Sequence, residues 1–146
     1  MSTLRAERDD FADAVRNLHT RTPLAGHLRV ELDSIEPGFV SARLPLKKDV
    51  TQQQGMAHAG TLAALADMVC GLAAYSLMPA GSNVVSSNIS LSLMRPGDGR
   101  ELLGRGRVIK AGGRLFFTEA DLIAVDESGE RLVAKASATM VRVAEE

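Results

Sequence analysis

One carboxylate, Asp67, stands alone in the longest apolar stretch of the chain, the segment over residues 55–77. A polar loop is expected over residues 47–57, followed by a helix that ends near residues 79–81; at 3.6 residues per turn Asp67 lies on this helix among small residues. No Lys, Arg or Glu occurs between Gly60 and Leu77, so we expect the helix to be buried nearly all round. A buried carboxylate needs a hydrogen-bond partner, and small neighbours leave room for a ligand. Asp67 is therefore the first candidate for chemistry, and a carboxylate merely paired within the core is the alternative.

Around this helix the sequence predicts a sheet and one further helix. Apolar residues at near-helical spacing predict an amphipathic helix from Ser2 or Thr3 to about His19. Runs of alternating polarity between turn residues predict strands at about residues 27–35, 39–46, 83–94, 100–111, 114–125 and 130–143. One long helix with about six mostly antiparallel strands indicates an α+β fold in which the sheet wraps the helix. We expect a single domain over residues 1–146, with its N-terminal helix within residues 1–22.

The strand at 83–94 alternates apolar and polar residues along its length. Its apolar members are Val85, Ile89, Leu91 and Leu93, and its polar members are Ser86, Asn88, Ser90 and Ser92. This pattern predicts that the apolar side chains meet the helix and that the polar ones face away.

The composition excludes several classes of partner. A formal charge of -1 and an aromatic content of 3% argue against nucleic acid. The N-terminus has no apolar run of signal-peptide length, and Asp67 interrupts the only long apolar run, so we expect no membrane span and a cytoplasmic protein. The single cysteine, Cys70, permits no intrachain disulfide and fits a small buried hydrophobe.

No metal or redox cofactor is expected. The three histidines lie far apart in sequence, without a Cys pair or an H-E-x-x-H motif. His19 fits a solvated helix end, and His27 fits a strand-start histidine bonded to the backbone. The G-x-S-x-G, P-loop and G-x-G-x-x-G signatures are also missing.

Two motifs resemble a known family. The run His58-Ala59-Gly60 precedes Asp67, and the later strand from Ser86 ends in Arg95-Pro96. This arrangement resembles the hotdog-fold acyl-CoA thioesterases of the phenylacetic-acid-degradation (PaaI-like) type, over the region from about residue 23 to residue 143. The resemblance implies a hotdog fold and the hydrolysis of an acyl-CoA thioester to a free acid and CoA, without a cofactor.

The resemblance also implies a role for each motif residue. Asp67 is the catalytic carboxylate, either as general base or as nucleophile. The backbone N–H of Ala59 polarises the thioester carbonyl, Gln52 lies near the substrate or the attacking water, and Ser86 supports the water or nucleophile. His58 shapes the loop before the helix. Independently of the resemblance, Ala59 lies at a helix N-terminus, where unpaired amides and the helix dipole favour an oxyanion.

The resemblance also implies a set of residues that contact the substrate and CoA. These residues are Gly60, Asn88, Arg95, Pro96, Gly113 and Arg114. Several basic residues cluster after the strand at 83–94, and one or two of them would bind the CoA phosphates. They are Arg95, Arg100, Arg105, Arg107, Lys110 and Arg114.

A single chain does not complete this site. Ala59 and Asp67 are eight residues apart on one helix, about 12 Å along its axis, too far to hold one thioester. We therefore expect an obligate homodimer with the site shared between protomers, and a dimer of dimers as the tetramer, as the resemblance also implies. A non-catalytic acyl-CoA-binding domain and a hydroxyacyl dehydratase are the alternative functions. Aromatic and aliphatic acyl groups both remain open.

Overall fold

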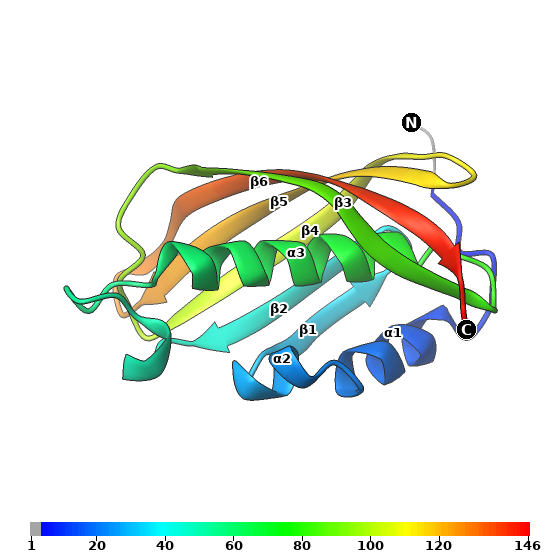
Figure 1. The fold of residues 1–146 in the computed structure, drawn as a ribbon. Coiled ribbons are helices and arrows are strands. Elements are labelled where there is room, and N and C mark those ends of the chain that lie inside the picture. Colours follow the sequence, from blue (N-terminus) through cyan, green and yellow to red (C-terminus); the bar gives the residue numbers. More distant parts are fainter. Residues whose placement is uncertain (1–3) are drawn as a thin grey trace.

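The computed structural model describes residues 4–146. Six antiparallel strands form one curved sheet that wraps around a single long helix, α3 (Ala59–Tyr75), as Figure 1 shows. The strand order is β1-β2-β4-β5-β6-β3. The bounds are β1 (Glu31–Glu36), β2 (Phe39–Pro45), β3 (Ser82–Leu93), β4 (Glu101–Ala111), β5 (Leu115–Asp126) and β6 (Gly129–Ala144). The predicted α+β fold is confirmed.

Three shorter helical segments complete the architecture. Helices α1 (Phe11–Thr20) and α2 (Pro23–His27) lie beside β1 and α3, and a 3-10 turn, η1 (Lys48–Val50), precedes α3. No helix in residues 4–146 is long and apolar enough to cross a membrane.

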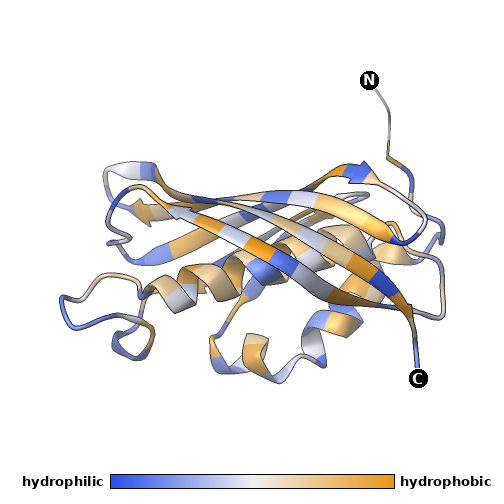
Figure 2. Ribbon diagram, turned by 45° about the horizontal axis from the view of Figure 1, so that its top comes forward, coloured by the Kyte–Doolittle hydropathy of each residue, from blue (hydrophilic) through white to orange (hydrophobic). Residues whose placement is uncertain are grey.

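Two glycines of β4 let α3 lie close to the sheet. A Cβ atom at Gly106 would lie 2.8 Å from the backbone nitrogen of Cys70, and one at Gly104 would lie 2.9 Å from Cγ of Leu65. A larger residue at either position would push the helix away. Figure 2 shows that α3 is apolar along most of its length. The face of α3 that carries Leu65 packs on β4, so Asp67 lies on the opposite side of the helix.

The N-terminal helix begins later than the sequence predicts. The predicted start at Ser2 or Thr3 lies outside the described residues, and α1 begins at Phe11. Its N-cap is Asp10, whose carboxylate accepts hydrogen bonds of 2.6 and 2.8 Å from Arg8. The carboxylate is thus engaged by Arg8 immediately before the helix, and it makes no side-chain capping bond to α1.

The first strand also begins later than predicted. Instead of a strand from His27, the chain forms the short helix α2, with Pro23 at its first position, where the missing N–H costs nothing. Arg29 then adopts a positive φ of 59°, which redirects the chain into β1 at Glu31.

A β-bulge in β3 overturns the predicted facing of its first half. Ser86 pairs with Met140 of β6, whereas Asn88 pairs with Thr139, so Ser87 is the extra residue between them. After the bulge Ile89 faces the helix side, as predicted. Before the bulge the order is reversed: Ser86 faces α3, and Val85 faces away with 46% of its surface exposed.

Candidate active site

Asp67 and Ser86 form the centre of the site. The Ser86 hydroxyl lies 2.5 Å from Oδ1 of Asp67 and donates its hydrogen to the carboxylate. Within residues 4–146, Oδ2 of Asp67 has no hydrogen-bond partner. The serine therefore fixes one oxygen of the carboxylate and leaves the other available to a water molecule or a substrate.

The carboxylate borders a hollow of about 190 Å³. We call it the carboxylate hollow; it is bounded by α3, by the β3–β6 pair and by the N-terminal helices, through Asp67, Gly71, Ser86, Met140, His19 and Thr22. Gly71 lies one turn after Asp67, and apart from its own helix backbone and chain neighbours no atom lies within 4 Å of the place of its missing Cβ, so it leaves open space beside the carboxylate.

His19 is not the solvated helix end that the sequence suggests. It is half-buried, and its Nε2 lies 2.8 Å from the carbonyl oxygen of Val30. The sequence did not lead us to place His19 in the hollow, although it contains a signal for this. His19 follows Val15, the buried residue of α1, by four positions and so lies on the same helix face. Thr22 had no comparable signal.

The start of α3 presents a backbone donor. The helix begins at Ala59 with His58 as its N-cap, and Nδ1 of His58 accepts a 2.8 Å hydrogen bond from the amide of Gly60. Thr61 and Leu62 donate their amides to the carbonyl of His58. The Ala59 amide has no partner among the residues that the structure describes, so it remains free for a ligand.

Several predicted site residues gather around this helix start. We call this depression the donor hollow; it includes Gln52, His58, Ala59, Arg95 and Pro96. The Gln52 side chain is folded over its own loop, where Oε1 accepts a hydrogen bond from the Gln54 amide and Nε2 donates to Oε1 of Gln54 at 3.2 Å. Arg95 is anchored by a 2.9 Å bond to the carbonyl of Leu132.

Other predicted site residues lie elsewhere. Asn88 pairs with Thr139 and faces away from α3, because the bulge at Ser87 reverses the facing. Gly113 and Arg114 form the turn between β4 and β5, where Arg114 shares a separate hollow with Ser82 of β3. One protomer does not bring these three residues to Asp67.

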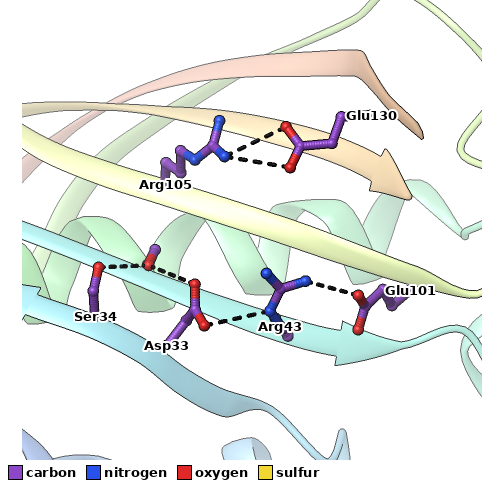
Figure 3. A network of polar contacts seen from close by, with 7 residues as sticks. Asp33, Ser34, Arg43, Glu101, Arg105 and Glu130 are labelled. Carbon is purple, nitrogen blue, oxygen red and sulfur yellow. Dashed lines mark hydrogen bonds and ion pairs between the residues drawn. The ribbon is translucent and has the colours of Figure 1, made fainter. Parts of the chain in front are cut away.

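Two of the basic residues considered for CoA binding form ion pairs on the outer face of the sheet, the face away from α3. Figure 3 shows Arg105 directed toward Glu130, at 3.4 Å. Arg107 pairs with Glu119 and lies 3.2 Å from Asp121. These partners and this location separate both arginines from the two hollows.

Among residues 4–146, the cysteine and the possible metal ligands were the remaining candidates for a reactive centre. Burial raises the pKa of the Cys70 thiol to about 11, so the thiol stays protonated at neutral pH. Within residues 4–146 no three His, Cys, Asp or Glu side chains lie close enough to hold a metal ion.

The family model of the thioesterase superfamily matches residues 54–131, the segment that carries α3 and strands β3 to β5. The chain belongs to the thioesterase superfamily. This assignment confirms the resemblance found in the sequence and the predicted class of thioester hydrolase. Gln52 and the N-terminal helices lie outside the matched segment.

Individual members of the superfamily agree with this assignment. The proofreading thioesterase EntH of Klebsiella pneumoniae is 25% identical over 118 residues, 81% of this chain and 85% of its own. A thioesterase family protein from Silicibacter pomeroyi has a solved structure with a TM-score of 0.90 and 30% identity, covering 92% of this chain and 99% of its own. The PaaI protein of Escherichia coli shares the fold with a TM-score of 0.81, at 19% identity over 92% of this chain and 94% of its own.

Proposed function

We propose that this protein is an acyl-CoA thioesterase whose active site joins the carboxylate hollow of one protomer to the donor hollow of another. The observation that carries the proposal is the pairing of Asp67 with Ser86, which leaves one carboxylate oxygen unengaged beside a hollow. A binding module has no need of such an oxygen, whereas hydrolysis requires a base or a nucleophile.

The reaction uses these groups in a defined order. The thioester carbonyl oxygen accepts a hydrogen bond from the Ala59 amide, which stabilises the negative charge of the tetrahedral intermediate. With Asp67 as general base, water attacks the carbonyl carbon while Asp67 takes its proton; with Asp67 as nucleophile, the carboxylate attacks and water then hydrolyses the mixed anhydride. In both routes the C–S bond breaks, CoA leaves as a thiolate and takes up a proton, and the acid is released.

A homodimer formed along β3 would assemble this site. β3 is an edge strand that pairs with β6 alone among the strands of residues 4–146, and nine of its twelve residues are exposed, including the apolar Val85, Ile89 and Leu93. Such an edge favours pairing with another strand. A two-fold axis would pair β3 with its copy in antiparallel orientation, which reverses one α3 relative to the other and can bring Ala59 of one chain toward Asp67 of its partner.

The same pairing offers a binding surface for CoA. The start of β3, at Ser82, shares a hollow with Arg114, and its end, at Leu93, borders the donor hollow with Arg95. Antiparallel pairing places the start of one β3 beside the end of the other. Arg114 of one protomer and Arg95 of its partner would then lie at the same end of the shared sheet, where they could hold phosphate groups.

A dimer of dimers is supported by an apolar patch on the outer face. Val85, Val141 and Leu115 are neighbours across β3, β6 and β5, and Phe117 is exposed beside them. This patch faces away from α3, so a second contact there leaves the β3 edge free.

The test of the activity is thiol release from aromatic and aliphatic acyl-CoA esters. Wild type should hydrolyse at least one ester, and Asp67→Asn should lose about a hundredfold or more, the size expected for a missing base. Circular dichroism and light scattering check that the variant folds and assembles. A wild type that binds acyl-CoA without hydrolysing it would overturn the proposal in favour of a binding module.

The test of the shared site is complementation. The Asp67→Asn chain keeps an intact donor hollow. The Ala59→Pro chain keeps an intact carboxylate hollow but lacks the amide of the donor hollow. Refolding equal amounts together should restore about a quarter of wild-type activity, because half of the dimers are mixed and each has one intact site. No recovery in a mixture that forms mixed dimers would show that each chain works alone.

A further inference from the structure

We propose that His19 and Thr22, from the N-terminal helices, determine specificity by accepting a hydrogen bond from a donor at the far end of a compact acyl group. This inference rests on the proposed function. It concerns residues outside the segment that matches the thioesterase family model.

The carboxylate hollow has the size of a small acyl group. Its volume of about 190 Å³ exceeds the roughly 150 Å³ of a protein cavity that holds benzene. One ring or a short branched chain fits this space. Leu18 and Ala25 on the N-terminal side and Val84 and Met140 on the sheet side make most of its wall apolar.

The hydrogen bond of His19 fixes which ring nitrogen can meet a ligand. The Val30 carbonyl only accepts, so Nε2 must carry the hydrogen in their 2.8 Å contact. In the neutral ring Nδ1 then carries a lone pair and no hydrogen. With the neutral ring, a hydrogen bond between this ring and a molecule in the hollow is one that Nδ1 accepts.

Thr22 can likewise only accept a hydrogen bond from a ligand. Its hydroxyl donates its only hydrogen to the Leu18 carbonyl at 2.8 Å, so the oxygen has only acceptor capacity left. The two polar groups on the N-terminal wall are thus both acceptors, within a largely apolar surface. A hydroxyl or amino group on the acyl part satisfies them, whereas an unsubstituted acyl group leaves them without a partner.

The test compares esters that differ only at the far end. The probes are benzoyl-CoA, 4-hydroxybenzoyl-CoA and 4-methoxybenzoyl-CoA, and hexanoyl-CoA beside 6-hydroxyhexanoyl-CoA. In at least one series the hydroxyl ester should have a kcat/KM about tenfold above its unsubstituted partner, the size of one or two hydrogen bonds. The methoxy ester, which cannot donate, should show no such advantage.

Variants assign the preference to its residues. His19→Phe and Thr22→Val should each reduce the ratio between hydroxyl and unsubstituted esters, and His19→Gln, which can still donate to Val30 and accept from a ligand, should retain part of it. His27→Phe and Thr20→Val are matched controls. His27 is exposed at the end of α2, and Thr20 makes the same type of bond, to the Arg16 carbonyl at 2.9 Å, outside the hollow. Neither control should change the ratio.

Binding separates this inference from the proposed function. Calorimetric Kd values for the same ester pairs on Asp67→Asn report the preference whether or not wild type hydrolyses them. A hydroxyl preference that disappears in Asp67→Asn/His19→Phe supports the inference even if hydrolysis fails. Equal affinity for both members of every pair, or a preference that survives both His19→Phe and Thr22→Val, would overturn it while leaving thioester hydrolysis intact.

Discussion

The two hollows along α3 use the same helix in different ways. At its start, the donor hollow presents a backbone amide, that of Ala59, while the side chains of His58 and Gln52 are engaged within their own loop. At its middle, the carboxylate hollow presents a side chain, Asp67, with one free oxygen among residues 4–146.

Because of this difference, the two hollows should tolerate different substitutions. A backbone donor survives most changes of side chain, so position 59 should tolerate substitutions that keep the amide. A carboxylate depends on its identity and on the residue that orients it. Under the proposed function each hollow supplies one half of the chemistry, and four predictions test this division, from the largest expected effect to the smallest.

Removing the amide while keeping the helix should disable the donor hollow. Proline is well accommodated at the first helical position, and His58 already has the extended ψ of 143° that a residue before proline prefers. Ala59→Pro should therefore fold and lose about 10²- to 10³-fold in kcat, the effect of one missing oxyanion donor. Steady-state kinetics measures this loss. Ala59→Gly, which keeps the amide, should remain active, and equal losses in both variants would contradict a backbone role.

Removing the orienting hydroxyl should weaken the carboxylate hollow without disabling it. Ser86→Ala deletes the 2.5 Å bond to Asp67, and a hydrogen bond to a charged group contributes enough to lower kcat by about tenfold. Ser90→Ala changes an exposed serine on the outer face of the same strand and should have no effect on kcat. A loss as large as that of Asp67→Asn would make Ser86 itself essential to the chemistry.

The side of α3 that packs on the sheet should be closed to reagents. Cys70 lies three residues after Asp67 but is fully buried, and burial raises the pKa of its thiol to about 11. Ellman's reagent should therefore not label native protein at pH 8 and should label one thiol per chain in guanidinium. Rapid labelling of the native protein would show that the helix opens on this side as well.

The β5–β6 turn lies outside both hollows and provides a control for pH dependence. Hydrogen bonds from Ser128 and Arg131 lower the pKa of Asp126 to about 2, from 3.8. Because the folded-state pKa is the lower one, this stabilisation is present above about pH 4 and is lost as the pH falls toward 2. Asp126→Asn should slightly lower the Tm at pH 7, give no difference near pH 2, and leave kcat unchanged. A Tm difference that persists at pH 2 would contradict this assignment.

The sequence was most informative where the pattern was long and regular. The five later strands and α3 lie close to their predicted positions, because each has a sustained period and clear turn residues at its ends. The start of α1 and the short α2 could not be predicted in the same way, since the Arg8–Asp10 pair and Pro23 act over only a few residues.

Some residues of the candidate site could be predicted from the sequence and others could not, for a related reason. The motif residues near α3 could be predicted as candidates because helix geometry and the family resemblance both point to them. The inward facing of Ser86 depends on a single extra residue, Ser87, that no alternation pattern reveals. His19 and Thr22 were missed because their place in the hollow depends on how α1 and α2 pack beside α3, and that packing is a tertiary contact.

The bulge in β3 also affects how the gene for this protein can lose a codon. Ser86 pairs with Met140 and Asn88 with Thr139, so deletion of the Ser87 codon would leave both pairs in register and both halves of the strand facing as before. Because Ser86 and Ser87 are the same residue type, losing either codon gives the same chain, with one serine still opposite Met140. The unpaired residue thus lets this strand lose one residue beside Asp67 and keep the partner of the carboxylate.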